Sequence, residues 1–290
     1  MSRALTGTVT RTGADPGARG AAQATRQGRP PTRKPFPEWL STLLWQLLLV
    51  VVVLSIWQLA HVNRWGVKVV VQSPSAVWNA FWTLSDDGTL WVNYWASLQA
   101  TLYGLLIACV IGIPLGLMLG LLPAVQRVIA PFLSALNAMP RIALAPVFII
   151  VFGITMSAKV ALSVSLVLFI VMLNAMAGVS AADPEAMRMM TTLGASRAQI
   201  LRMVVLPSAL PSILVGVRLG LIYSLLGVIA SELIASADGL GQLIARSAGV
   251  FDLATVYAVL ILLMITAAFF NTLSEVAGRR MLQWQPPAAR

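Results

Sequence analysis

Three polar residues inside long apolar segments are the strongest candidates for contact with a solute. Arg141 lies between two prolines, Asn174 lies inside one apolar segment, and Glu232 lies near the end of another. Charged groups at membrane depth are costly and mark functional sites, and a guanidinium pairs well with sulfonate, nitrate or carboxylate groups. We predict a substrate pathway that includes Arg141, Asn174 and Glu232. The alternatives are a structural or gating hydrogen bond for Glu232 and a helix-to-helix hydrogen bond for Asn174.

The chain lacks the residues for several other kinds of chemistry. Its one histidine, His61, excludes a site that needs two histidines, and its one cysteine, Cys109, excludes an intrachain disulfide or a cysteine metal cluster. The sequence contains neither a phosphate-binding G-x-x-x-x-G-K-[ST] loop nor a G-x-S-x-G nucleophile elbow. We therefore predict no cofactor or metal on this chain, and a membrane enzyme is disfavoured.

The composition indicates an integral membrane protein. Hydrophobic residues make up 58% of the 290 residues and charged residues only 10%, whereas soluble domains carry about 25% charged residues. The net charge is +10, and seven of the twenty basic residues lie in the first 34 positions. We interpret this charge as loop charge that orients membrane spans, and we predict no nucleic-acid partner.

Six segments are long and apolar enough to cross a bilayer as helices. They cover about 40–61, 97–122, 129–152, 159–179, 212–235 and 254–276. The third is interrupted by Pro140, Arg141 and Pro146. The predicted fold is all-α, with a polytopic transmembrane domain at 37–285, a disordered basic tail at 1–36 and a short tail at 286–290.

Glycines at spacing four predict that the second and fifth spans pack closely against other helices. Small residues at this spacing let helix backbones approach one another in lipid. The glycines are Gly112, Gly116 and Gly120 in the second span, and Gly216 and Gly220 in the fifth.

The basic residues orient these spans. With the N-terminus inside the cell, the cytoplasmic segments contain fourteen Lys and Arg residues, and the outer segments contain four, one of which is Lys159. Arg218 is expected to reach the inner interface. This asymmetry predicts that both termini are cytoplasmic. On the outer side, SPSAVWNAFWTL predicts an amphipathic surface helix that begins at Ser73 and Pro74, and 236–252 predicts a polar loop with a short helix.

The segment 183–207 is a cytoplasmic loop with strong punctuation. Asp183 and the proline after it predict a helix start, and Gly194 suits the left-handed residue that ends this helix. Ser196 and Gln199 form a capping box for a second helix. We expect Pro207 to break or bend that helix before the fifth span.

The first helix of this loop carries apolar side chains. They are Met187, Met189, Met190 and Leu193. Methionines suit a surface that grips a moving partner, and the alternative is that these side chains pack on the protein's own spans.

The loop resembles the "EAA" motif of binding-protein-dependent ABC importer permeases. That motif is Glu-Ala-Ala, three residues, Gly, nine residues, Ile, one residue and Leu-Pro. With Gly194 at the Gly position, the spacing places Val204 at the Ile position and Leu206-Pro207 at the Leu-Pro position. Arg188, Met189 and Met190 stand where the motif has Glu-Ala-Ala. The fragments SPSAVW, MPRIALAPVFIIVFG, LPSALPSILVGVRLGL, SELIA and GLGQLI resemble the nitrate, sulfonate and taurine branch, over roughly residues 70–284.

The resemblance implies a type I ABC importer permease in the cytoplasmic membrane of a bacterium. It implies a second permease copy, which gives a homodimer, two ATPase subunits that bind ATP and Mg²⁺, and an extracytoplasmic substrate-binding protein. It also implies that the 183–207 loop docks on the ATPase. The coupling residues would be Arg188, Met189, Met190, Leu193, Gly194, Ala195, Ser196, Leu206 and Pro207. The expected substrate is a small anion such as a sulfonate, taurine or nitrate. The alternative to an ATP-driven importer is a secondary active transporter of a small anion.

Overall fold

The computed structural model describes residues 38–63 and 72–283, and the predicted tails 1–36 and 286–290 lie outside them. Within the described ranges the elements are all helical. They are α1 (Glu38–Val62), α2 (Pro74–Asp86), α3 (Thr89–Leu121), α4 (Pro123–Ala138), η1 (Arg141–Leu144), α5 (Ala145–Phe152), α6 (Met156–Ser180), α7 (Pro184–Thr192), α8 (Arg197–Ile200), η2 (Leu201–Val205), α9 (Leu206–Ile234), α10 (Leu240–Gly249) and α11 (Leu253–Met281). The described chain divides inside α1, after Val52, into two units, and α2 to α11 all belong to the second.

Five helical stretches of the described chain are long and apolar enough to cross a membrane, and α4 with η1 and α5 adds a sixth as a broken span. The two halves of that span are bent by 77°. The bend lies at Met139, which is extended (φ −67°, ψ 133°) because the following Pro140 disfavours helical backbone before it. The predicted all-α polytopic membrane fold is confirmed, and the third span is interrupted at its prolines.

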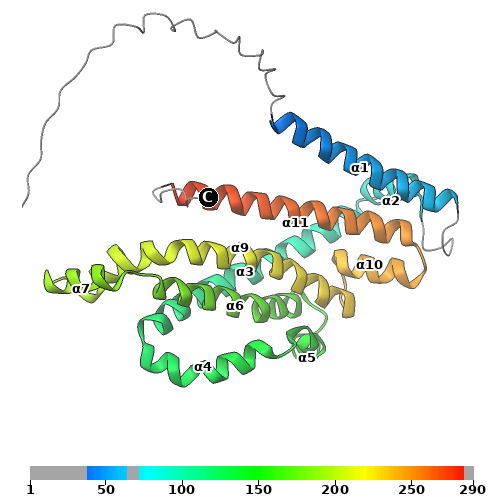
Figure 1. Ribbon diagram of the computed structural model, residues 1–290. Coiled ribbons are helices and arrows are strands. Elements are labelled where there is room, and N and C mark those ends of the chain that lie inside the picture. Colours follow the sequence, from blue (N-terminus) through cyan, green and yellow to red (C-terminus); the bar gives the residue numbers. More distant parts are fainter. Residues whose placement is uncertain (1–37, 64–71, 284–290) are drawn as a thin grey trace, which may run out of the picture. The chain divides into compact units, whose positions relative to one another are not determined.

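Helices α3, α6 and α9 form the centre of the second unit and pack against one another (Figure 1). Glycines let their backbones approach closely. A Cβ on Gly116 of α3 would lie 2.2 Å from the backbone oxygen of Met172 on α6, and a Cβ on Gly178 of α6 would lie 2.8 Å from that of Ala209 on α9. Small residues at helix crossings are the usual means of tight packing in lipid. The predicted role of glycines at spacing four is therefore confirmed for the α3–α6 crossing.

A second cluster lies where α2, α3, α10 and α11 meet. Ser73 caps α2 by accepting a hydrogen bond from the backbone N–H of Ala76 (3.1 Å), which confirms the predicted helix start. The buried core of the cluster contains Leu90, Leu240, Leu243 and Val259, and Phe81 of α2 packs against it. Trp78, Trp82, Trp91 and Trp95 remain exposed. The exposed indole rings lie on α2 and the first turns of α3, and exposed tryptophans suit a membrane interface.

Of the two outcomes predicted at Pro207, a break or a bend, the break is wrong. The residues Arg197–Ile234 form one continuous helical stretch of 38 residues. Its second segment, Leu201–Val205, is a π-helix, in which the N–H of Leu206 bonds to the carbonyl of Leu201. Pro207 then lies in the first turn of α9, where a missing N–H is tolerated. The wider π turn thus accommodates the proline without ending the helix.

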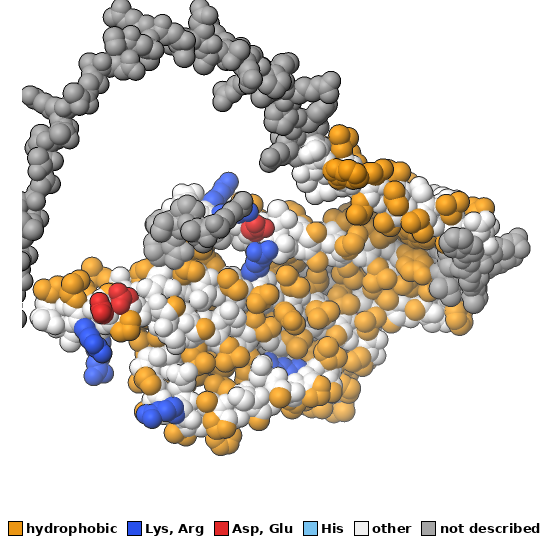
Figure 2. Space-filling view, in the orientation of Figure 1, with side chains coloured by type: hydrophobic (Ala, Val, Ile, Leu, Met, Phe, Trp, Pro, Cys, Tyr) orange, Lys and Arg blue, Asp and Glu red, His pale blue; other side chains and the backbone are white. Residues whose placement is uncertain are grey.

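The surface of the second unit agrees with a membrane setting. Figure 2 shows hydrophobic side chains over most of the visible face, with charged side chains in a few places that include the end at α7. Many large apolar residues on the spans are more than half exposed, among them Leu106, Val110 and Ile150. Such a surface is stable only where lipid or a partner protein covers it.

Candidate functional site

A cavity of about 450 Å³ lies between the broken third span and helices α6 and α9. Two of the three predicted pathway residues, Arg141 and Asn174, line it together with Asn137 and Tyr223. None of the described residues that line it is acidic. Glu232 does not line this cavity, so the structure brings two of the predicted residues together and separates the third.

Arg141 begins η1 and is only 8% exposed. Its Nη1 donates to the backbone oxygens of Ser165 and, at 3.5 Å, Leu166, both on α6. Its Nη2 donates to the backbone oxygen of Leu136 (3.2 Å) and to Asn137 Oδ1 (3.3 Å), both in the last turn of α4. The guanidinium therefore joins the two halves of the broken span to α6.

The positive charge of Arg141 has neutral neighbours. Its Cζ lies 3.9 Å above the ring of Phe169, and its hydrogen-bond acceptors are carbonyl oxygens. No carboxylate of the described residues lies within salt-bridge distance of it. The C-terminal end of α4 and the aromatic face stabilise a cation, but a full negative charge is not supplied. The wall of the cavity is consequently electropositive, which favours an anion over a cation.

Asn174 is anchored to its own helix on the cavity wall. Its Nδ2 donates to the backbone oxygen of Ile170 at 2.8 Å. Its side chain packs against α9, where a Cβ added to Gly216 would lie 2.7 Å from the Cβ of Asn174. Asn174 thus combines a place in the lining with a packing contact between α6 and α9.

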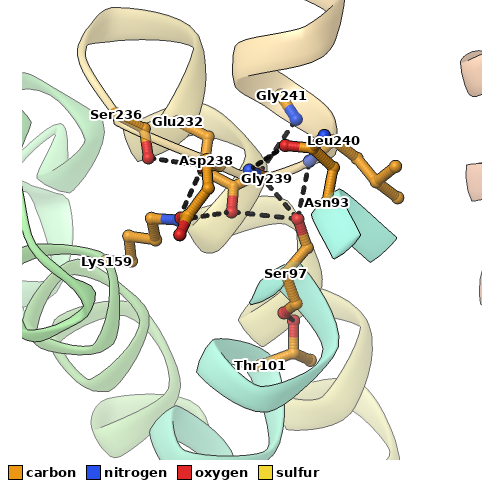
Figure 3. Close-up of polar contacts among 10 residues, drawn as sticks. All are labelled: Asn93, Ser97, Thr101, Lys159, Glu232, Ser236, Asp238, Gly239, Leu240 and Gly241. Atoms are coloured by element: carbon orange, nitrogen blue, oxygen red, sulfur yellow. Dashed lines mark hydrogen bonds and ion pairs between the residues drawn. The ribbon is translucent and has the colours of Figure 1, made fainter. Parts of the chain in front are cut away.

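Glu232 lies in a separate cluster of polar groups (Figure 3), near the C-terminal end of α9. The residue is 1% exposed. Its carboxylate accepts hydrogen bonds from Ser97 Oγ (2.9 and 2.8 Å) and from the backbone N–H of Gly241 (2.9 Å). Lys159 Nζ lies 3.2 Å from Glu232 Oε1. These contacts join α3, α6, α9 and α10 through one buried carboxylate.

Lys159 is counted with the basic residues of the outer segments, at the start of the predicted span 159–179, and the structure buries it. It lies in the first turns of α6 and is 3% exposed. Its Nζ donates to the backbone oxygen and to Oδ1 of Asp238, at 2.7 and 2.5 Å. The sequence contains a signal for this pair, since a cation opens the fourth apolar segment and an anion follows the fifth. Consecutive spans run in opposite directions, so these two ends meet on the same side.

Arg218 lies on α9 and does not line the cavity. Its Nε donates to Asn271 Oδ1 (3.0 Å), and its Nη2 lies 3.8 Å from Glu275 Oε2, both on α11. Glu275 also pairs with Arg279 at 2.5 Å. The side chain of Arg218 is 39% exposed, so it takes part in a polar contact between two helices at the surface.

The loop between α6 and α9 has the predicted punctuation. Asp183 caps α7 by accepting from the N–H of Glu185 (2.8 Å). Gly194 has φ +79° and ends the turn after α7. Ser196 and Gln199 form a complete capping box, with bonds of 2.7 and 3.3 Å. The two helices around a glycine corner are therefore confirmed.

The apolar side chains of α7 face two ways. Met187 packs against the buried cluster of Val179, Ala182 and Val205. Met189 and Leu193 are 61% and 75% exposed. The 183–207 loop is thus held to the protein's own helices by Met187 together with Ile200 and Leu201, and it presents Met189 and Leu193 outward. The remaining residues predicted to couple, which are Arg188, Met190, Ala195, Ser196, Leu206 and Pro207, lie on or next to this corner or at the start of α9.

The sequence is similar to that of known transport proteins. Residues 112–283 match the family described as "Binding-protein-dependent transport system inner membrane component". A putative aliphatic sulfonates transport permease protein of Escherichia coli is 33% identical, over 87% of this chain and 95% of that protein. A riboflavin transport system permease protein of Chloroflexus aurantiacus is 32% identical over 74% and 81%. The taurine transport system permease protein of Escherichia coli is 36% identical over 56% and 59%.

The fold is similar to that of solved transporters. A structure of the MetNI methionine ABC transporter in inward facing conformations has a TM-score of 0.61. The match covers 68% of this chain and 97% of that chain, at 20% sequence identity. At this identity the likeness concerns the helical arrangement of the permease.

Proposed function

We propose, from the premise that this chain belongs to the family of binding-protein-dependent transport system inner membrane components, that it forms the translocation path of an ATP-driven importer for a small anion. As a member of this family the chain is the permease of an ABC importer and is not itself an enzyme. The anion, the coupling to an ATPase and the subunit composition are the parts of the proposal that go beyond the family.

One observation carries the choice of an anion. Arg141 places a buried positive charge on the wall of a 450 Å³ cavity whose described lining includes no acidic side chain. A small anion that enters this cavity gains a charge-assisted interaction with the guanidinium, while a cation is repelled. We propose that Arg141 and Asn174 line the path. Glu232, which lies outside the cavity, is assigned to a structural or gating hydrogen bond.

We propose a sulfonate, taurine or nitrate as the solute, each of which carries an anionic sulfonate or nitrate group. Two of the relatives are named for aliphatic sulfonates and for taurine, and a third for riboflavin. The test is uptake of taurine, an alkanesulfonate, nitrate and riboflavin by vesicles that contain the complete transporter. ATP-dependent uptake of the alkanesulfonate, of nitrate or of taurine, whose sulfonate group is anionic although the molecule is zwitterionic, supports the proposal. Uptake of riboflavin alone overturns the anion assignment, and uptake that persists without ATP favours a secondary transporter.

The assembly that we propose contains two copies of this chain, two ATPase subunits and an extracytoplasmic substrate-binding protein. ATP and Mg²⁺ would be bound by the ATPase subunits. Purification of the chain in mild detergent tests this composition. If the 183–207 loop docks on an ATPase, the ATPase subunit should co-purify with the chain. Failure to recover any ATPase subunit would count against the coupling.

The coupling role of the loop depends on the shape of its corner. Valine at position 194 is strained at φ +79°, by about 1–3 kcal/mol, although no atom obstructs its Cβ. We expect Gly194→Val to lower the solute transported per ATP hydrolysed by about tenfold, while the protein still inserts into the membrane. Measured ATP hydrolysis and uptake in the same vesicles give this ratio.

Gly88→Val is the matched control for this experiment. Gly88 has φ +76° and open space around its Cβ, but it lies between α2 and α3, away from the loop. If both variants lose coupling to the same extent, the defect comes from strain in general and the docking role of the corner is wrong.

The orientation that we propose has both termini and the 183–207 loop in the cytoplasm. It predicts that a cysteine at Ala237, in the exposed α9–α10 loop, reacts with a membrane-impermeant maleimide in intact cells. A cysteine at Thr192, exposed at the end of α7, should react only after permeabilisation. Both are made in a Cys109→Ser background, since Cys109 is the only native cysteine. The reverse labelling pattern would invert the topology.

A further inference from the structure

The polar cluster around Glu232 holds the start of α10 in place with side chains from other helices. Helix α10 begins after Gly239, which has no side chain to cap it. Three successive N–H groups nevertheless have acceptors: that of Gly239 bonds to Asn93 Oδ1 (2.7 Å), that of Leu240 to Ser97 Oγ (2.8 Å) and that of Gly241 to Glu232 Oε2 (2.9 Å). Figure 3 shows these acceptors arriving from α3 and α9. The first turn of α10 is therefore capped from outside its own segment.

The carboxylate of Glu232 and the backbone of this segment fit closely. A Cβ on Gly239, whose φ is +113°, would lie 2.0 Å from Glu232 Oε1, and a Cβ on Gly241 would lie 2.7 Å from Glu232 Cβ. Two glycines thus make room for the buried carboxylate. The fragments SELIA and GLGQLI, which are separated in the sequence, supply the two sides of this one contact.

Lys159 completes the cluster from α6. Its three N–H donors have three acceptors, which are Glu232 Oε1, Asp238 Oδ1 and the backbone oxygen of Asp238. It is the charged group that neutralises Glu232, which is otherwise a buried anion. It also fixes the loop Ala235–Gly239 directly, through a backbone atom. The side chain of Asp238 itself is 55% exposed, so the fixed loop presents a carboxylate at the surface.

The helices that carry these groups form a tight unit. Below the cluster, Ser224 Oγ on α9 lies 2.6 Å from Ser163 Oγ on α6 and donates to the backbone oxygen of Thr101 on α3 (2.6 Å). A Cβ on Gly227 of α9 would lie 2.7 Å from Leu166 of α6. The loop Ala235–Gly239 is consequently attached to closely packed helices, which argues against a flap that opens independently of them.

We propose that Lys159 and Glu232 are positioning residues that fix the loop Ala235–Gly239 and the start of α10 as a rigid contact surface for the extracytoplasmic binding protein. This inference rests on the proposed function and orientation. A buried ion pair such as Lys159–Glu232 contributes little net stability compared with apolar side chains packed in the same place. The cluster instead fixes the position of the backbone, because five hydrogen bonds hold the four successive residues 238–241.

The test compares variants that remove charge in different ways. Lys159→Met/Glu232→Gln removes both charges, and the glutamine retains an oxygen that can accept from Ser97 and Gly241. Lys159→Met alone leaves a buried anion and serves as the destabilised reference. Asp86→Asn is the surface control, because it removes an exposed carboxylate at the end of α2, outside the cluster and outside the loop Ala235–Gly239.

The first measurement is the stimulation of ATP hydrolysis by the binding protein, in vesicles containing the complete transporter. For Lys159→Met/Glu232→Gln we expect the concentration of binding protein at half-maximal stimulation to rise at least about tenfold, with a maximal rate within about twofold of the wild type. Asp86→Asn should shift this concentration by less than about threefold. An unchanged half-maximal concentration in the double variant, or a loss of maximal rate without such a shift, overturns the inference.

A second measurement does not depend on any partner. A spin label on Ala237→Cys in the Cys109→Ser background reports the mobility of the loop in the purified chain. We expect a broad, immobilised spectrum in the parent and a sharper one in Lys159→Met/Glu232→Gln. Equal spectra overturn the fixation of the loop by this pair. If the wild-type transporter shows no response to its binding protein, the proposed function fails, and the spectra still decide whether Lys159 and Glu232 hold the loop.

Discussion

Replacing Arg141 with methionine is expected to reduce uptake of the transported anion by about 100-fold, the equivalent of about 2.7 kcal/mol. The change removes the positive charge from the cavity wall. It also removes the bonds from the guanidinium to α4 and α6. The acceptors of these bonds are neutral, so no buried charge is left unpaired and the chain should still insert. Uptake and yield after size-exclusion chromatography measure the two effects separately.

Two further variants decide how Arg141 acts. Arg141→Lys keeps the charge but cannot bridge α4 and α6 with a planar fork, and it should retain part of the uptake if charge is the main requirement. Arg218→Met removes another arginine of the spans, one that is 39% exposed and contacts α11 outside the cavity. Uptake by Arg218→Met should stay within about threefold of the wild type, as expected for a surface pair. Equal losses in Arg141→Met and Arg218→Met would contradict a specific role of the cavity.

A methyl group on Gly116 is expected to destabilise the helical core by about 3 kcal/mol. The new Cβ would lie 2.2 Å from the backbone oxygen of Met172 and 2.7 Å from the Cβ of Ala175. A backbone oxygen cannot rotate away, so α3 must move from α6 along the crossing. The thermal midpoint of the purified chain in detergent, followed by loss of the monodisperse peak, measures this change.

Gly278→Ala serves as the control for Gly116→Ala. Gly278 lies in α11, and a methyl group added to it would have no heavy atom of another element within 4 Å. Alanine is the better helix former by about 1 kcal/mol, so this variant should be as stable as the parent or slightly more stable. A similar loss in both variants would show that the close α3–α6 crossing is not what makes Gly116 sensitive.

The features that sequence can predict are those written in local patterns. Apolar segments of about 20 residues predict the spans, and the capping signals of Asp183, Ser196 and Gln199 predict the two loop helices, all of which the structure contains. The break of the third span follows from its prolines. Each of these depends on residues that are close together in the chain.

The features that sequence misses depend on distant residues. The burial of Lys159 is not evident from its place at the start of an apolar segment, because its partners Glu232 and Asp238 lie 73 and 79 positions away. Pro207 does not break the helix, because the π turn before it accommodates the proline. This π turn has no clear sequence signature. The meeting of Arg141 and Asn174 at one cavity is predicted only as a shared role, since their distance depends on how α6 packs against the broken span.

The continuous helical stretch Arg197–Ile234 has a consequence for the tolerated lengths of this chain. At 1.5 Å per residue it measures about 57 Å, and it runs from the residues next to the Gly194 corner to those next to the Ala235–Gly239 loop. One inserted residue would turn everything beyond it by about 100°. Such an insertion would change the angle between the Gly194 corner and the Glu232–Ser97 contact near the other end of the stretch. Insertions and deletions should therefore be absent from this rod in functional relatives and confined to the connections outside it.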